Sequence, residues 1–205
     1  DITGATKLTC LLGNPVSHSI SPAMHNASFQ KLGLDYTYLA FSVDETHFER
    51  AVDGLITLGA AGWNCTMPLK RLMYERVDTL SDSALLSGAV NTVVNRDGQL
   101  FGDNTDGYGF LQSMRDAGFS CEGKHAVLLG SGGAAAAILA QAALDGAAAI
   151  DVFARSASAS TKLIAEEIQR IHARCDCRIR LFDLADSTSL RHCLDEADVL
   201  INASS

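Results

Sequence analysis

One segment constrains the fold more than any other feature of the sequence: the glycine-rich run Gly130-Ser131-Gly132-Gly133-Ala134. It directly follows a fully apolar run, 126–129, and leads into an alanine-rich stretch. Glycines in such a turn permit a tight bend and let the backbone approach a pyrophosphate, which the free N–H groups of a helix N-terminus bind. The segment therefore predicts a strand, a phosphate-binding turn and a helix. The alternative interpretation is that the glycines serve only the turn.

The rest of the second half of the chain continues this alternation of strand and helix. The expected strands are 126–129, 150–153, 178–182 and 199–201, and the expected helices are 161–173 and 189–196. Regular βα alternation implies a parallel sheet with right-handed crossovers. We therefore expect a Rossmann dinucleotide-binding domain over residues 107–205. Such a domain commonly has about six strands, so we expect this one to be incomplete at its C-terminus.

The first hundred residues also alternate strand and helix signals. Apolar or alternating runs at 7–12, 36–43 and 62–65 predict strands, and Asp97-Gly98 between two further strands predicts a hairpin. The fold class is therefore α/β throughout, with an N-terminal α/β substrate-binding, catalytic domain over residues 1–106 followed by the Rossmann domain.

The second strand of the Rossmann domain indicates which dinucleotide is bound. An acid near the end of that strand binds a ribose hydroxyl, whereas an arginine accommodates a 2′-phosphate. Asp151 lies at the start of the strand, where it cannot reach the ribose, and Arg155-Ser156 stands at its exit. This favours NADP, with Arg155 as the phosphate ligand. NAD remains the alternative, as does an ordinary surface role for Arg155.

Small polar residues are dense where the first expected strand leads into a helix. Ser19 and Ser21 lie at that helix start, where hydroxyls and backbone N–H groups can hold a carboxylate. Taken alone, the simpler interpretation is that Ser21 is the helix N-cap, with Pro22 at the first helical position, and that Ser19 is a turn residue.

A second polar cluster contains a lysine in an electrostatically unfavourable place. Asn64 and Thr66 precede a helix that we expect to begin at Pro68, and Lys70 falls in its first turn. The positive end of a helix disfavours a cation, so the pKa of Lys70 is expected to be lowered unless an acid compensates. A lysine of this kind is a candidate acid/base.

Two downstream segments supply further polar groups. Asp106 lies in the glycine-flanked loop 102–107, and Asn91 lies at the start of a strand. Asp106 is a candidate partner for Lys70, although two such residues can also form a surface ion pair of little energetic value.

Together these segments resemble one known family, shikimate dehydrogenase, including its quinate/shikimate branch. The resemblance covers essentially the whole chain and rests on motifs in matching order and spacing: Ser-x-Ser-Pro, Asn-x-Thr-x-Pro-x-Lys, Gly-Ala-Val-Asn-Thr, Asn-Thr-Asp-Gly and Gly-x-Gly-Gly-Ala. The family's Asn-Arg-Thr aligns with Ala154-Arg155-Ser156, a departure that loosens the assignment of NADP.

The resemblance implies a role for each matching residue. Ser19 and Ser21 hold the substrate carboxylate, Asn91 and Asp106 bind ring hydroxyls with Thr66 and Asn64 nearby, and Lys70 is the acid/base paired with Asp106. The cofactor pyrophosphate binds at Gly130, Ser131, Gly132, Gly133 and Ala134, and its 2′-phosphate at Arg155 and Ser156. The implied reaction is NADP-dependent reduction of 3-dehydroshikimate to shikimate. A quinate-active enzyme using NAD and a non-catalytic metabolite-binding fragment are the alternatives.

Composition excludes other classes of partner. The net charge of −8 argues against binding to nucleic acid or to an anionic membrane surface, and no apolar run has the length of a membrane span. We therefore expect a small-molecule substrate, shikimate or 3-dehydroshikimate, and leave a homodimer open.

Six cysteines without a Cys-x-x-Cys pair are typical of free thiols in a cytoplasmic protein. Cys175, Cys177 and His172 are poorly spaced as metal ligands, so no metal is expected.

Overall fold

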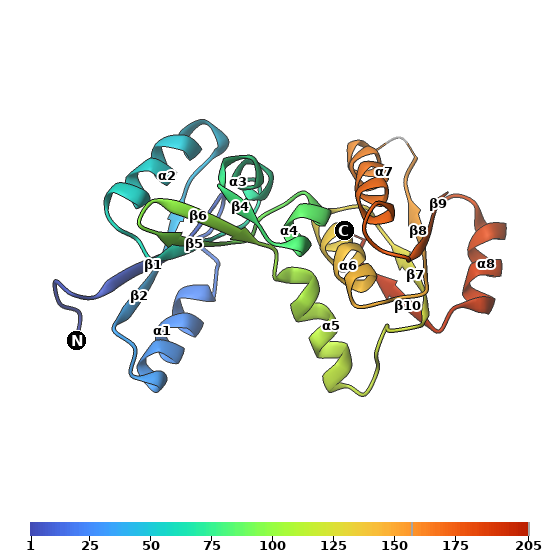
Figure 1. Ribbon diagram of the computed structural model, residues 1–205, viewed down its shortest axis with the longest axis horizontal. Coiled ribbons are helices and arrows are strands. Elements are labelled where there is room, and N and C mark those ends of the chain that lie inside the picture. The colour runs from blue at the N-terminus through green and yellow to red at the C-terminus, as the bar shows by residue number, and fades with distance from the viewer. Residues whose placement is uncertain (157, 205) are drawn as a thin grey trace. The chain divides into compact units, whose positions relative to one another are not determined.

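A computed structural model describes residues 1–156 and 158–204, and the chain divides into two compact α/β units. The first unit comprises residues 1–84 and 89–103, and the second comprises 85–88 and the chain from Asn104 onward. The ribbon in Figure 1 shows the elements of both units. The division before Asn104 lies close to residue 106, where the sequence analysis set the domain boundary. The functional roles given to the two domains stay predictions.

The first unit contains a six-stranded mixed sheet in the order β2-β1-β3-β5-β6-β4. β2, β1 and β3 are parallel, whereas β5 runs antiparallel to both β3 and β6. Its elements are β1 (Lys7–Gly13), α1 (Ser21–Leu32), β2 (Tyr36–Ser42), the short 3₁₀ helix η1 (Glu45–His47), α2 (Phe48–Thr57), β3 (Gly62–Cys65), α3 (Lys70–Arg76), β4 (Thr79–Leu80), α4 (Asp82–Ser87, which crosses into the second unit), β5 (Thr92–Arg96) and β6 (Gln99–Asp103).

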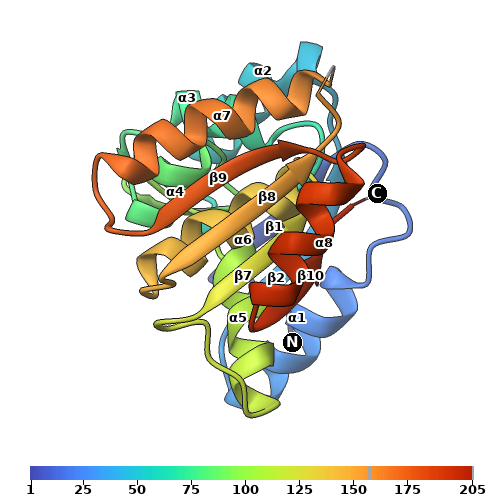
Figure 2. The ribbon, with the colours of Figure 1, turned by 90° about the vertical axis from the view of Figure 1, so that its right-hand side faces the viewer.

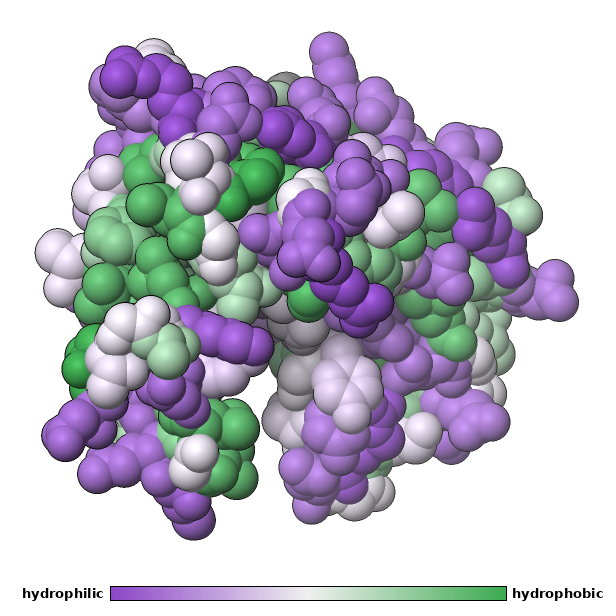
Figure 3. Space-filling view, turned by 60° about the vertical axis from the view of Figure 1, so that its left-hand side comes forward, coloured by the Kyte–Doolittle hydropathy of each residue, from purple (hydrophilic) through white to green (hydrophobic). Residues whose placement is uncertain are grey.

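Side chains along each strand alternate between the two faces of this sheet, and one face is buried in the core. In β5 and β6, Val93 and Leu100 are buried in the core with the apolar side of α2, while the adjacent Val94 and Phe101 are each 37% exposed. Successive strand residues point to opposite faces, so the second pair lies on the other side of the sheet. Apolar (green) surface gathers on the side of the molecule that comes forward in Figure 3.

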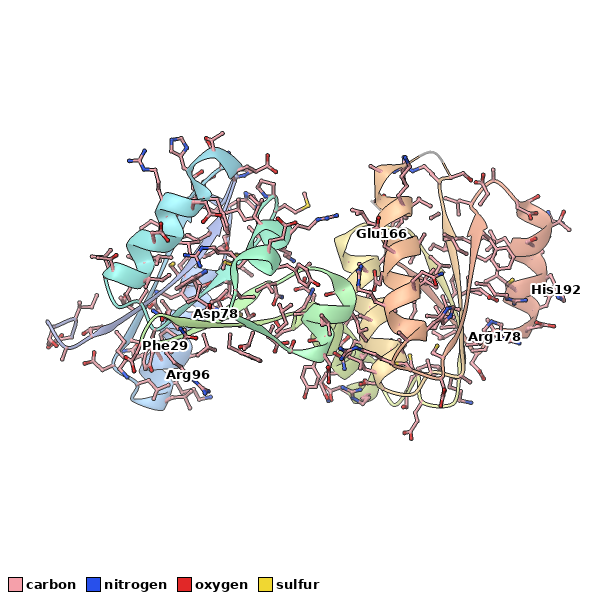
Figure 4. All side chains as sticks on the ribbon, turned by 45° about the horizontal axis from the view of Figure 1, so that its top comes forward. Phe29, Asp78, Arg96, Glu166, Arg178 and His192 are labelled. Carbon is pink, nitrogen blue, oxygen red and sulfur yellow. The ribbon has the colours of Figure 1, made fainter. Side chains whose placement is uncertain are left out.

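The hairpin turn in the first unit matches its sequence signal. Asp97 and Gly98 both have positive φ, 53° and 89°, as a two-residue hairpin turn between β5 and β6 requires. The strand β6 is also tied to the segment that follows α3, because the backbone N–H of Leu100 donates to Asp78 at 2.7 Å. Asp78 is labelled in Figure 4.

Two predicted helix starts are wrong. The N-cap of α1 is Ile20, not Ser21; Ser21 is the first helical residue, and its N–H donates to Ser19 Oγ at 3.2 Å. Ser19 therefore supplies the hydroxyl that satisfies this free backbone group. The helix expected from Pro68 begins at Lys70, because 66–69 form a turn in which the Leu69 N–H donates to the Thr66 carbonyl.

The second unit contains a four-stranded parallel sheet in the order β10-β7-β8-β9. Its elements are α5 (Asp106–Asp116), β7 (His125–Leu129), α6 (Gly133–Leu144), β8 (Ala149–Ala154), α7 (Ala159–His172), β9 (Arg178–Asp183), α8 (Ser187–Glu196) and β10 (Val199–Asn202). The four expected strands are all present, each within a residue or two of its predicted bounds.

Helices cover both faces of this sheet, as a parallel sheet requires. Ala126 and Leu128 of β7 pack in the large core with α6 and α7, whereas the alternate residue Val127 packs with Cys193 of α8 on the opposite face. Figure 2 shows α8 on its own side of the sheet. Close packing of α5 against α6 depends on Gly107, where a Cβ would stand 2.1 Å from the carbonyl oxygen of Ala137.

Candidate functional site

The loop after β1 and the start of α1 form a pocket of mixed polar and apolar lining in the first unit. Ser19, Ser21 and Thr66 all line this pocket, which has a volume of about 340 Å³. Thr66 is held against β1: its N–H donates to the Leu12 carbonyl at 2.8 Å, and a Cβ on Gly13 would stand 2.2 Å from the Thr66 methyl group. Three hydroxyl groups that the sequence assigned to substrate binding are thus brought together at one pocket.

The two amides assigned to substrate binding lie on β3 and just before β5, the next strands of the same sheet. Asn64 is on β3, and Asn91 directly precedes β5, where it is 8% exposed. Asn64 Nδ2 donates to the Asn91 carbonyl at 3.2 Å, so the two residues are direct neighbours. Asn64 lines a different pocket, of about 310 Å³, from the one that contains the serines.

Lys70 is the first residue of α3, half-buried, and its carbonyl accepts the N–H of Val90 at 2.9 Å. This hydrogen bond holds the start of α3 beside the loop that carries Asn91. Asp106 is the first residue of α5, and its N–H donates to Asn104 Oδ1 at 3.2 Å. Lys70 belongs to the first unit and Asp106 to the second, and their pairing stays a prediction.

The predicted phosphate turn connects β7 to α6 in the second unit. Gly130 has φ +116°, and a Cβ there would stand 2.6 Å from the Ala203 carbonyl oxygen, so a side chain would clash with the chain after β10. Gly132 is the N-cap of α6, and a Cβ on Gly132 or Gly133 would meet nothing within 4 Å. A helix N-terminus with open space beside its backbone suits an anionic group. The turn therefore fits a dinucleotide pyrophosphate.

Hydroxyl groups link this turn to the loop after β8. Ser131 Oγ lies 2.8 Å from Ser160 Oγ and 3.3 Å from Thr161 Oγ1, at the beginning of α7. The same Thr161 hydroxyl donates to the carbonyl of Arg155 at 2.8 Å. Arg155 directly follows β8 and is exposed, as expected for a ligand of a 2′-phosphate, and the neighbouring Ser156 hydroxyl donates to Asp183.

Asp151, the other acid considered for the ribose, is fully buried within the second unit. Arg180 donates to its two carboxylate oxygens, each at 2.7 Å, and His125 Nε2 lies 2.8 Å away. Burial alone would raise the pKa of Asp151, but the hydrogen bonds from Arg180 and His125 lower it to about 2. The carboxylate is engaged inside the domain, as its position at the start of the strand suggested.

Comparison with known proteins gives a consistent result. The family model for the shikimate dehydrogenase substrate binding domain matches residues 11–93. A shikimate dehydrogenase (NADP(+)) from Listeria monocytogenes is 43% identical over 202 residues, which are 98% of this chain and 69% of that protein.

Two solved structures extend the likeness. The crystal structure of shikimate 5-dehydrogenase from Listeria monocytogenes in complex with shikimate and NAD is 43% identical, with a TM-score of 0.95 over 99% of this chain and 70% of that one. The ligand-free 5-ketofructose reductase of a Gluconobacter strain is 34% identical, with a TM-score of 0.84 over 99% and 70% of the two chains.

The chain belongs to the shikimate dehydrogenase family. Its α/β fold, a substrate domain followed by a Rossmann-type domain, is the fold of that family, and both were expected from the sequence.

Two residues of this shikimate dehydrogenase family member were missed as functional candidates. Tyr38 donates its hydroxyl hydrogen to Asn64 Oδ1 at 2.8 Å, and Thr92 donates to Asn91 Oδ1 at 2.8 Å. Thr92 belongs to the Gly-Ala-Val-Asn-Thr motif, but no function was assigned to it from the sequence. No local pattern marks Tyr38, which occupies an ordinary inward position of an alternating strand.

The structure also bears on the cysteines, on metal-binding clusters and on membrane-spanning helices. All six cysteines lie among the described residues and are free thiols. The described part of the chain contains no cluster of three or more His, Cys, Asp or Glu side chains suited to a metal ion. None of the helices described has both the length and the apolar character needed to cross a membrane.

Proposed function

We propose that this chain binds shikimate and a nicotinamide dinucleotide as an NADP-dependent shikimate dehydrogenase, an oxidoreductase that reversibly reduces 3-dehydroshikimate to shikimate in the chorismate and aromatic amino acid pathway. The observation that carries the proposal is the pocket where Ser19, Ser21 and Thr66 meet. Its three hydroxyl groups suit the carboxylate of a small acid, and the amides of Asn64, on β3, and Asn91, directly before β5, lie in the same sheet region.

Each side chain in this proposal has a defined task. Ser19 and Ser21 donate hydrogen bonds to the substrate carboxylate, and Asn91 and Asp106 bind ring hydroxyls. Lys70 gives a proton to the carbonyl oxygen during reduction and takes it back from the hydroxyl during oxidation, with Asp106 keeping the ammonium group in place. A positioned acid/base of this kind contributes about 10²- to 10⁴-fold to the rate.

The dinucleotide supplies the hydride when it is bound. In this chain the turn 130–134 holds the pyrophosphate, and Arg155 with Ser156 holds the 2′-phosphate of NADP. The fit rests on the open space beside Gly132 and Gly133 and on the exposed guanidinium at the end of β8. NAD binds the same turn without the contact to Arg155.

Free thiols and a small-molecule substrate favour a cytoplasmic protein. A homodimer is compatible with the proposal, and analytical ultracentrifugation of the purified chain tests it directly.

The test combines binding with turnover. Shikimate affinity is measured by calorimetry, and shikimate-dependent reduction of NADP⁺ is followed at alkaline pH by the absorbance of the reduced cofactor. We expect Lys70→Ala to lower turnover by about 10²-fold or more while shikimate and NADP binding stay within about threefold. The matched control is Arg71→Ala, which changes a neighbouring cation of α3. Near-normal turnover by Lys70→Ala would overturn the acid/base assignment.

Parallel assays with quinate and with 5-ketofructose distinguish the neighbouring activities. The second substrate is included because the Gluconobacter reductase shares this fold at 34% identity. Preference for either substrate over shikimate would replace the proposed activity. Binding of shikimate without turnover, under conditions where the cofactor also binds, would favour a metabolite-binding protein.

A further inference from the structure

Three hydrogen bonds in series connect Tyr38 to Asn91 within the first unit. The Tyr38 hydroxyl donates to Asn64 Oδ1 at 2.8 Å, and Asn64 Nδ2 donates to Thr92 Oγ1 at 3.0 Å. The Thr92 hydroxyl then donates to Asn91 Oδ1 at 2.8 Å. Every step runs in the same direction, from donor to acceptor, so the bonds polarise and strengthen one another. We call Tyr38, Asn64, Thr92 and Asn91 the amide relay.

The relay matters because the side-chain amide of an asparagine can flip by half a turn. Its oxygen and nitrogen are similar in size, and a half-turn exchanges an acceptor for two donors. For Asn64 the choice is fixed by the Asn91 carbonyl, which lies 3.2 Å from Nδ2 and can only accept. A turned amide would place oxygen against oxygen there. The Tyr38 hydroxyl then completes the preferred orientation by donating to Oδ1.

The orientation of Asn64 favours one orientation of Asn91. Because the Thr92 hydroxyl accepts from Asn64, its own hydrogen is available for Asn91 Oδ1. The Asn91 amide oxygen is thereby held toward Thr92, and its NH₂ group is directed away from Thr92. The backbone of Asn91 is fixed as well, since its N–H donates to the Asp103 carbonyl and its carbonyl accepts from the Cys65 N–H.

The amide relay begins at Tyr38, whose side chain and backbone are both held in place. Its side chain is 3% exposed and stacks on His25, with ring centroids 4.3 Å apart and planes at 14°. Asn26 holds its backbone on both sides: Nδ2 donates to the Tyr38 carbonyl at 2.8 Å, and Oδ1 accepts the Tyr38 N–H at 2.9 Å. Burial raises the pKa of the phenol, so the hydroxyl keeps its hydrogen and stays a donor.

We propose that Tyr38 and Thr92 are positioning residues for substrate recognition: through Asn64 they present the NH₂ group of Asn91 as a hydrogen-bond donor to a ring hydroxyl of the substrate. This inference rests on the proposed function of the same site. It makes the site select a substrate with an acceptor oxygen at that position. A neighbouring acid of similar size without that oxygen cannot accept this hydrogen bond and binds more weakly.

Thr92→Val tests the relay with little change of shape. We expect shikimate affinity to fall about fivefold, the effect of one neutral hydrogen bond, and KM to rise while kcat changes less. Thr92→Ser keeps the hydroxyl and should restore affinity to within about twofold. Tyr38→Phe should weaken affinity in the same direction and by less, because the Asn91 carbonyl still orients Asn64. Thermal unfolding of each variant is measured, so that a loss of folded protein is recognised.

A double-mutant cycle separates positioning from a general effect on the fold. In an Asn91→Ala background, Thr92→Val should change shikimate affinity by less than about twofold, because no amide is left to orient. An equal effect in both backgrounds would overturn the relay, as would Thr92→Val binding shikimate as tightly as the unmodified chain. Failure of the unmodified chain to bind shikimate would instead reject the proposed function itself.

Discussion

The hydroxyl of Ser156 donates a hydrogen bond to the carboxylate of Asp183, joining the ends of two adjacent parallel strands, β8 and β9. Hydrogen bonds from the Ala185 N–H and from Ser156 lower the pKa of Asp183, so the group is an anion at neutral pH. Dinucleotides bind outside the carboxyl ends of such strands. An anion therefore lies next to the serine that is assigned to the 2′-phosphate.

From this contact we predict that Asp183→Asn shifts cofactor preference toward NADP. The amide oxygen keeps the acceptor for the Ala185 N–H, and the NH₂ group that replaces the second oxygen can donate to the Ser156 hydroxyl oxygen. The charge that repels the phosphate is removed. We expect the ratio of NAD to NADP dissociation constants to rise about fivefold at low ionic strength, and less at high salt, because both groups are exposed. Fluorescence titration with each cofactor measures it. Asp186→Asn removes a nearby charge that has no bond to Ser156, and its ratio should change less.

Arg155→Ala tests whether the arginine contributes to the preference for NADP over NAD. Loss of a charge-assisted contact to a phosphate should weaken NADP binding by about 10- to 100-fold. NAD affinity should stay within about twofold, because NAD has no 2′-phosphate. The control is Lys162→Ala, a cation one turn into α7. Equal losses for both cofactors would show that Arg155 acts through the fold rather than through the phosphate.

Two glycine substitutions in the second unit should distinguish an effect on stability from an effect on cofactor binding. Gly107→Ala places a Cβ against the Ala137 carbonyl, and α5 must move away from α6. We expect the free energy of unfolding to fall by about 1–3 kcal/mol, as for other overpacked sites. Gly132→Ala meets no protein atom, so its cost should be smaller, no more than about 1 kcal/mol for alanine in place of glycine at the N-cap of α6, while cofactor affinity falls. Urea unfolding and cofactor titration of both variants check this pair of outcomes.

The sequence predicted the elements whose signals are local. The turn after β7 follows from its glycines, and the hairpin follows from Asp97-Gly98, because both depend on backbone conformations that few residues adopt. The hydroxyl cluster at Ser19 and Ser21 was also predictable, although Ser21 was assigned as the N-cap of α1, which is Ile20. The local backbone conformation decides which hydroxyl group accepts from a given backbone N–H. A sequence motif does not specify that conformation.

Contacts between distant segments could not be predicted in this way. Tyr38 and Asn64 are 26 residues apart, and they meet only because β2 and β3 both pair with β1 in the observed register. A one-residue slip in either strand would point these side chains to the opposite face of the sheet. The triad formed by the buried Asp151 with Arg180 and His125 depends on register in the same way.

The triad should make the second unit sensitive to acid. The folded pKa of Asp151, about 2, lies below the ordinary value of 3.8, so the carboxylate stabilises the fold above about pH 4 and this contribution is lost as the pH falls toward 2. Asp151→Asn should lower the free energy of unfolding by about 2 kcal/mol at neutral pH, a value reduced because Arg180 is 38% exposed. Its unfolding free energy should approach that of the unmodified chain near pH 2.

Glu167 should show the opposite dependence on pH. It is 1% exposed on α7, and its Oε1 has no hydrogen-bond partner among the residues described, whereas the adjacent Glu166 is exposed (Figure 4). Burial raises the pKa of Glu167 well above its ordinary 4.5, and Arg170 lowers it only in part. Above pH 4.5 the unfolded chain releases this proton while the folded chain retains it. Stability therefore falls as the pH rises from 4.5 toward the folded pKa.

Glu167→Gln removes the ionisable group and keeps its shape, so it should be more stable than the unmodified chain at neutral pH, with the advantage disappearing below pH 4.5. Urea unfolding across the acidic and neutral range measures the difference. Glu166→Gln is the matched control, because its carboxylate is already in water in the folded chain, and its curve should run parallel to that of the unmodified protein. A constant gap between Glu167→Gln and the unmodified protein at every pH would mean that Glu167 is already ionised in the folded state.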